Sequence, residues 1–211
     1  MRSFLETYGV AIFTLVLGLL GMKIKNATTD KVNQTEEIGN DEVYVAATGR
    51  PKPPKTAVDQ VYCIYYDDGE MTISQNKIEP EAGRTVVNKG FYDRPTGCTQ
   101  EMTTVRFIGA VMPKTCYQWL SYCSKLTEIK NIENLYVNQV IAMNGMFMYD
   151  RQLKSIDLTF FDIPADVSIK QMFDKCYNNI TVKAKSSTID SIKKANSGYL
   201  WVDRCNWEIV K

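Results

Sequence analysis

The sequence predicts an α+β fold: a short solenoid of about three repeats with a β-rich N-terminal cap, on a stalk that follows one N-terminal transmembrane helix. Three observations carry this prediction. One pattern recurs three times between Trp119 and Val182, alternating apolar segments precede it, and an uncharged apolar run occupies residues 7–22. A fixed period of roughly 20–50 residues is typical of chains whose units must stack to bury their apolar edges.

The recurring pattern places two large apolar residues, a third residue three positions on, and two further apolar positions at spacings that advance by 27 and then 26 residues. The three copies are Trp119, Leu120, Cys123, Leu126, Ile129; Met146, Phe147, Asp150, Leu153, Ile156; and Met172, Phe173, Cys176, Asn179, Val182. The first three positions fit one helical turn that faces inward, and the last position lies in a segment that alternates as short strands do. The copies therefore predict a repeating core.

The second copy carries a family resemblance. Its residues run Met146-Phe147, Leu153, Ile156-Asp157-Leu158, Phe161-Asp162 and Val167, and the next copy opens with Met172-Phe173 and Cys176. This order resembles the BspA-like family of bacterial surface leucine-rich repeats, and the likeness continues upstream through Leu126–Leu135. The resemblance implies a leucine-rich-repeat-like solenoid exposed outside the cell. The chain departs from the family pattern at Asp150, where Cys is usual, at Asn179, where Leu is usual, and at Ile163-Pro164-Ala165.

The N-terminal run predicts a membrane anchor over residues 1–24. No charge occurs between Glu6 and Lys23, and the run is slightly shorter than the roughly 20 residues that a spanning helix needs. No small-residue cleavage site follows it, which favours an uncleaved signal anchor over a removed signal peptide. The lysines after Met22 do not favour an external C-terminus by charge, so the extracellular head rests on the family resemblance.

The rest of the chain divides by composition. Residues 25–57 are polar and rich in Pro, which predicts a flexible stalk. Residues 58–110 predict a β-rich cap, with a hairpin turn at Asp67-Asp68-Gly69. Residues 111–186 hold the repeats. Residues 187–211 predict a C-terminal cap, made of a helix from Ile189 to Asn196 and closing strands at 199–202 and 207–210.

Composition argues against catalysis. The 211 residues include no His, so Ser-His-Asp and Cys-His arrangements are excluded, and no phosphate-cradling or CxxC motif occurs. We therefore expect no enzyme, no cofactor and no metal. Of six cysteines, Cys123 and Cys176 occupy the inward pattern position and are expected to be unpaired. Four others, Cys63, Cys98, Cys116 and Cys205, leave three disulfide pairings open.

These observations predict a membrane-anchored surface protein whose head binds a protein or a glycan. The expected partners are the membrane, through the N-terminal helix, and that unknown ligand; nucleic acid is not expected, because the net charge is only +1. The predicted ligand site is the face of the short strands: Glu128, Lys130, Ser155, Asp157, Thr181 and Lys183. The alternative is a pilin-like or envelope assembly subunit, although Glu6 precedes the apolar run where a pilin has its acidic residue inside it.

Overall fold

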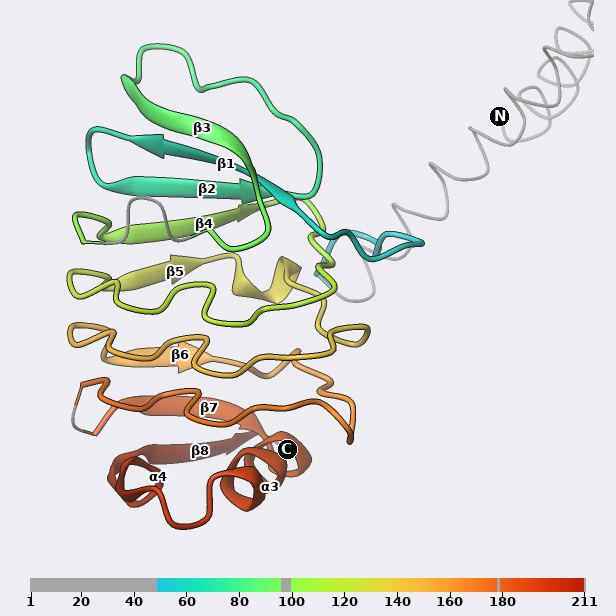
Figure 1. Ribbon diagram of the computed structural model, residues 1–211, viewed down its shortest axis with the longest axis vertical. Helices are drawn as coiled ribbons and strands as arrows, with labels where there is room; N and C mark the ends of the chain where they lie inside the picture. The colour runs from blue at the N-terminus through green and yellow to red at the C-terminus, as the bar shows by residue number, and fades with distance from the viewer. Residues whose placement is uncertain (1–48, 96–99, 178, 211) are drawn as a thin grey trace, which may run out of the picture. The chain divides into compact units, whose positions relative to one another are not determined.

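The computed structural model describes residues 49–95, 100–177 and 179–210, and Arg50–Lys211 form one compact unit. The described residues are mainly β and form two sheets (Figure 1). The first contains β1 (Val61–Tyr66), β2 (Glu70–Ser74), β3 (Val86–Tyr92), β4 (Thr104–Ile108) and β5 (Glu128–Lys130), in the order β3-β1-β2-β4-β5. The second contains β6 (Ser155–Asp157), β7 (Thr181–Lys185) and β8 (Asn206–Val210), in the order β6-β7-β8.

The first sheet begins with the hairpin that the sequence predicts. β1 pairs antiparallel with β2, and the Gly69 amide donates to the Tyr66 carbonyl at 3.1 Å. Gly69 has a φ of +88° and lies so close to Thr103 that a Cβ would sit 2.9 Å from its Oγ1, so both the turn and the packing require glycine. β3 pairs antiparallel with β1, whereas β4 and β5 continue the sheet in parallel from β2.

The second sheet is entirely parallel, and the C-terminal elements lie at the same end of the molecule as β8 (Figure 1). α3 (Ser186–Ala195) follows β7 directly, and its basic last turn, Lys193 and Lys194, suits the negative end of the helix dipole. α4 (Leu200–Arg204) occupies the segment that alternation predicts as a closing strand at 199–202, so that prediction is wrong. Trp201 explains the difference, because one turn of helix is enough to bury its ring against Phe173.

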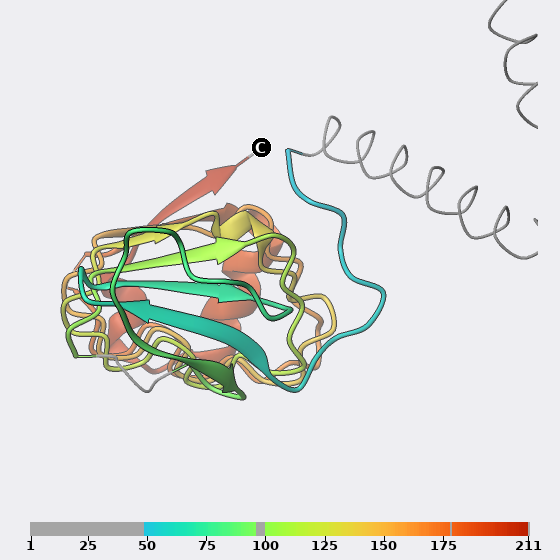
Figure 2. The same cartoon turned by 90° about the horizontal axis from the view of Figure 1, so that it is seen from above.

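The copies of the repeated pattern meet through their loops. The Leu120 amide donates to the Met146 carbonyl at 2.9 Å, and the Phe147 amide donates to the Met172 carbonyl at 3.0 Å. Backbone amides at every second residue of 116–122 donate to carbonyls of 142–148, and those at every second residue of 143–149 donate to carbonyls of 168–174. We call residues 116–122, 142–149 and 168–174 the loop ladder. Figures 1 and 2 show these loops lying one above another in the stack.

The fold class predicted from the sequence is wrong. The copies do not form a solenoid with one continuous sheet, because β5 of the first copy joins the five-stranded sheet while β6 and β7 of the later copies join β8. A 3-10 helix, η1 (Ile132–Asn134), follows β5 after Asn131, which has a φ of +56°. Each of β5 and β6 is only three residues long, and no backbone ladder pairs one with the other in the described residues.

The inward positions of the pattern nevertheless form the core. Trp119, Leu120, Phe147 and Phe173 are at most 1% exposed. The Phe147 and Phe173 rings are stacked, with centroids 5.3 Å apart and planes at 9°, and Phe173 meets Trp201 edge to face at 5.9 Å. The burial predicted from the spacing is therefore confirmed for these four residues, whereas Cys176 and Ile129 are only half-buried and Asn179 is exposed. The predicted helical turns at these positions are instead hydrogen-bonded turns that contain residues with positive φ.

An ion-pair network holds the outer face of the first sheet. Glu70 accepts from Arg84 at 3.0 Å and from Arg106 at 2.6 Å, and both arginines also contact Glu81. Burial raises the pKa of Glu70, but the hydrogen bonds from Arg106 and Arg84 outweigh that effect and hold the pKa below its usual value. The same two arginines lower the pKa of Glu81. Several charges sharing partners make this network sturdier than isolated surface pairs.

The folded unit begins at Arg50, inside the segment 25–57 that the sequence predicts as a stalk. Arg50 is 6% exposed, with its guanidinium 4.0 Å from the Tyr136 ring centroid, and the Tyr136 hydroxyl donates to the Pro51 carbonyl. The structure thus places residues 50–57 against the head. The predicted anchor at residues 1–24 and most of the predicted stalk lie outside the described residues, and the helices that are described are too short and too polar to cross a membrane.

The cysteine thiols lead to a labelling prediction. Cys116, Cys123, Cys176 and Cys205 form no disulfide within the described part of the chain, and burial raises the pKa of each thiol, that of Cys205 to about 12. Because the thiolate is the reactive form, we expect iodoacetamide to modify Cys116 and Cys123 only after denaturation. Peptide mass spectrometry with and without denaturant measures this. Equal labelling of Cys123 in native buffer would show that it does not face inward.

Candidate functional site

The strand-face residues that the sequence predicts as a ligand site lie in two different sheets. Glu128 and Lys130 belong to β5, whereas Ser155, Asp157, Thr181 and Lys183 belong to β6 and β7. Their charges are largely neutralised within the protein. Lys183 Nζ lies 2.7 Å from Asp157 Oδ2, and Lys130 Nζ lies 3.6 Å from carboxylate oxygens of both Glu70 and Glu128. Two of the six residues thus lie in the first sheet and four in the second.

A different surface, on the outside of the loop ladder, combines aromatic rings with cations. The rings of Tyr122 and Tyr149 are stacked, with centroids 4.6 Å apart and planes at 12°, and Tyr122 is 51% exposed. The Arg151 guanidinium lies 5.8 Å from the Tyr149 ring centroid. We call this surface the aromatic-cationic face; its members are Tyr122, Tyr149, Arg151, Lys175, Tyr177 and Arg204.

Left-handed backbone turns produce this face. Tyr122, Tyr149 and Lys175 have φ values of 65°, 67° and 60°, a conformation that is uncommon for residues other than glycine. In the first two copies each such residue immediately precedes a buried one, Cys123 or Asp150. The chain therefore turns one side chain into the core and the preceding one out to solvent. Loop-ladder bonds from the amides of Tyr122 and Tyr149 hold the turns.

The cations of the face carry no ion pair within the described ranges. Arg151, Lys175 and Arg204 are exposed, and all three line a groove of about 530 Å³ together with Cys176, Tyr177 and Asn179. Lys114, Lys125 and Lys185, in contrast, each contact a carboxylate within 2.8 Å. Three positive charges around one groove favour an anionic ligand, because no carboxylate of the described residues has to be displaced before binding.

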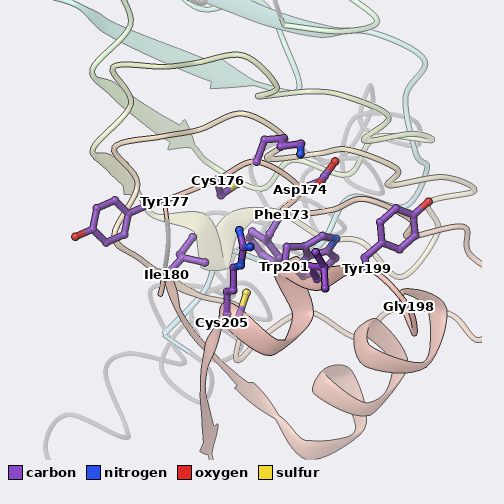
Figure 3. Close-up of a pocket in the computed structure, with 12 residues that line it drawn as sticks. Phe173, Asp174, Cys176, Tyr177, Ile180, Gly198, Tyr199, Trp201 and Cys205 are labelled. Carbon is purple, nitrogen blue, oxygen red and sulfur yellow. The ribbon is translucent and has the colours of Figure 1, made fainter.

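A cavity of about 340 Å³ adjoins this groove and shares Lys175, Cys176, Tyr177 and Arg204 with it. Figure 3 shows Phe173 and Trp201 side by side in the cavity, with Tyr177 and Tyr199 at opposite sides. The loop after Phe173 supplies one wall, and α4 with the residues before it supplies the other. The lining combines aromatic rings with charged side chains, and rings beside a few polar groups are common in small-ligand sites.

The chemistry of the cavity is suited to binding. Its two thiols, Cys176 and Cys205, are held protonated, because burial raises the pKa of both, and Cys176 Sγ donates to the Phe147 carbonyl at 2.7 Å. A protonated thiol is a poor nucleophile. Among the described residues no group of three His, Cys, Asp or Glu side chains is placed to hold a metal ion. The other lining groups include aromatic rings, the cations of Lys175 and Arg204, and the carboxylate of Asp174.

Comparisons with known proteins do not assign the chain to a family. No protein-family model, no curated protein and no solved structure matches the chain. The resemblance to BspA-like surface proteins therefore stays a prediction, and the argument about function depends on the geometry of the aromatic-cationic face.

Proposed function

We propose that this protein is a non-catalytic binding module, anchored at a bacterial cell surface through its N-terminal segment, that holds an anionic glycan on the aromatic-cationic face. The observation that carries the proposal is that three cations with no ion pair in the described part of the chain lie beside exposed tyrosine rings. Extended ligands suit this face because the loop ladder presents Tyr122, Tyr149 and Lys175 on successive turns. The surface location follows the apolar run at residues 7–22 and the family resemblance.

A glycan fits this face better than a folded protein or a nucleic acid. Tyrosine offers an apolar ring face on which the C–H face of a sugar can pack, together with a hydroxyl that stays in water. The centre of a protein interface is depleted in charged residues, whereas three charged side chains line this groove. Nucleic-acid binding depends on many Lys and Arg contacts to phosphates, and a groove with three cations provides few.

The proposal predicts binding of polygalacturonate but not of its fully methyl-esterified form, which has the same backbone without the charge. The full-length chain is titrated with each polymer and binding is followed by calorimetry. We expect replacement of the three groove cations by Gln to weaken polygalacturonate binding roughly tenfold or more, since each surface charge contributes a fraction of a kcal/mol. Binding should also weaken as salt is added.

A second triple variant provides a matched control with the same change in net charge. It carries Gln at three lysines that are already ion-paired elsewhere on the surface: Lys114, Lys125 and Lys185. We expect it to bind polygalacturonate as the unmodified chain does. Equal loss in both triple variants would mean that net charge alone attracts the polymer, and equal binding of the esterified form would remove the anionic requirement; either result contradicts the proposal.

A further inference from the structure

The folded unit has one edge strand at each end of its stack. β3 is the outer strand of the first sheet and β8 is the outer strand of the second, so within the described residues each pairs with a neighbouring strand on one side only. Figure 1 shows β3 at one end of the stack and β8 at the other. The free edge of a strand presents a row of amide and carbonyl groups with which another strand can pair.

Both edge strands expose large apolar side chains. Val87 and Phe91 of β3 are 57% and 49% exposed, and Ile209 of β8 is 63% exposed. Figure 2 shows the end of β8 reaching out from the rest of the folded unit. Neither strand contains Pro, which would prevent pairing at an edge. Pairing with a further strand would take part of this apolar surface out of water, which favours association.

The one charged residue of each strand lies at the centre of that strand. Lys89 is the middle residue of β3, and Glu208 is the middle residue of β8. Both are exposed, and neither has an ion pair within the described part of the chain. Lys183 lies opposite Glu208 in β7, but its amine is paired with Asp157 at 2.7 Å. The two central charges are therefore open to a partner.

These charges distinguish between the possible strand partners. Opposite charges directly across a strand pair stabilise it, and like charges destabilise it. Two copies of β8 paired antiparallel over their whole length would bring Glu208 opposite Glu208. Two copies of β3 would bring Lys89 opposite Lys89 in the same way. Only the pairing of β8 with β3 of a second copy, centre to centre, brings Glu208 opposite Lys89.

The same register matches the two faces of the strands. In β8 the odd-numbered residues lie on the core side, because Trp207 is opposite the buried Val182. In β3 the even-numbered residues lie on the core side, because Gly90 is opposite the core residue Cys63. With the two charges opposite each other, odd residues of β8 meet even residues of β3, and the core sides continue each other. A shift of one residue would lose this match.

We propose that the protein assembles end to end, with β8 of one copy adding as a strand to β3 of a second copy. The contact joins two different surfaces, so a complex of two copies keeps one free β3 and one free β8, and further copies add to it. Five residues of strand make a small interface, and the association is therefore weak unless copies are concentrated, as they are when anchored to one surface. This assembly does not depend on the glycan-binding function.

The test measures the weight-average mass of the full-length chain by sedimentation equilibrium in one mild detergent, over a range of protein concentrations. For the unmodified chain we expect the mass to rise beyond that of a dimer. Lys89→Glu and Glu208→Lys should each weaken the association roughly 2- to 30-fold, because each replaces an attractive cross-strand pair by a repulsive one. Association through the apolar run at residues 7–22 would be the same in every variant.

The variant that carries both reversals is expected to associate as the unmodified chain does, because the two charges again attract each other. A single variant that had merely misfolded would not be restored in this way. Lys154→Glu and Asp166→Lys provide matched controls, since they make the same changes in net charge at exposed positions outside the strands. Neither control should change the association.

Four results would overturn the proposal. The unmodified chain could stay monomeric at every concentration, or its mass could stop at that of a dimer, which indicates a closed symmetric contact. Association unaffected by Lys89→Glu would show that β3 is not the partner of β8. Failure of the double reversal to restore association would show that the two charges do not meet.

Discussion

Replacing Phe147 or Phe173 by Ala is expected to lower the free energy of unfolding by about 3–5 kcal/mol in each case, as truncation of a buried aromatic side chain does. Both rings are at most 1% exposed and stack on each other, and Phe173 also fixes Trp201. Each truncation therefore opens a cavity between two turns of the loop ladder. Urea denaturation followed by circular dichroism measures the loss.

The control for this prediction is Lys154→Ala. Lys154 is exposed, so its truncation should change the free energy of unfolding by no more than about 0.5 kcal/mol. In the double variant the two Phe truncations should not be additive, because the rings are in contact. Additive effects, or similar losses in all three single variants, would contradict the stacked aromatic core.

Asp150→Asn is expected to remove the part of the pH dependence of the unfolding free energy that comes from the Asp150 carboxyl. Asp150 is fully buried; its Oδ1 accepts from the Cys123 amide at 3.0 Å and its Oδ2 has no partner within the described residues. Burial raises its pKa well above 3.8, and the Cys123 bond opposes this only in part. The folded protein therefore keeps a proton that the unfolded chain has already released at the same pH.

The sign follows from this difference. The contribution of Asp150 to stability is complete below pH 3.8 and is lost as pH rises towards the folded pKa, with a slope of at most about 1.4 kcal/mol per pH unit for one proton. Asn keeps the acceptor for Cys123 but does not titrate. The variant should therefore gain stability relative to the unmodified chain as pH rises from acid to neutral.

The difference between the two proteins isolates Asp150 from other carboxylates. The pKa values of Asp68, Glu70 and Glu81 are lowered, so their contribution is lost only as pH falls through those values, and it is the same in both proteins. Asp166→Asn, at an exposed position, should change the unfolding free energy by about 0.5 kcal/mol or less at every pH. A constant difference between Asp150→Asn and the unmodified chain would show that the buried carboxyl is not protonated.

Local patterns in the sequence predict the core better than they predict the architecture. The spacing of Phe147 and Phe173 is enough to place both rings inward, and Gly69 after two aspartates is enough to place the hairpin. The separation of the copies into two sheets depends on which strands pair with each other, and the spacing of the pattern does not predict that pairing. β5 gains a parallel partner in β4, so the first copy adds to the N-terminal sheet, and the three-residue strand β6 pairs only with β7 in the described residues.

The aromatic-cationic face could not be predicted from the sequence, because its residues lie in loops and in α4 and not in the short strands. Tyr122, Tyr149 and Lys175 do recur at the spacing of the pattern, one position before Cys123, Asp150 and Cys176. Positive φ turns these side chains outward, and a sequence gives little sign of that conformation when the residue is not glycine. The sequence also does not predict that the charges of the strand face neutralise each other. The ion pair between Asp157 and Lys183 depends on the register of β6 and β7.

A crystal structure of the chain with a galacturonate oligomer tests the central claim most directly. We expect the oligomer to lie along the outside of the loop ladder, with its carboxylates at Arg151, Lys175 and Arg204 and its sugar faces against the exposed tyrosines. An oligomer bound instead on the strand face, at Lys130 or Lys183, or absent from the aromatic-cationic face at saturating concentration, would contradict the account.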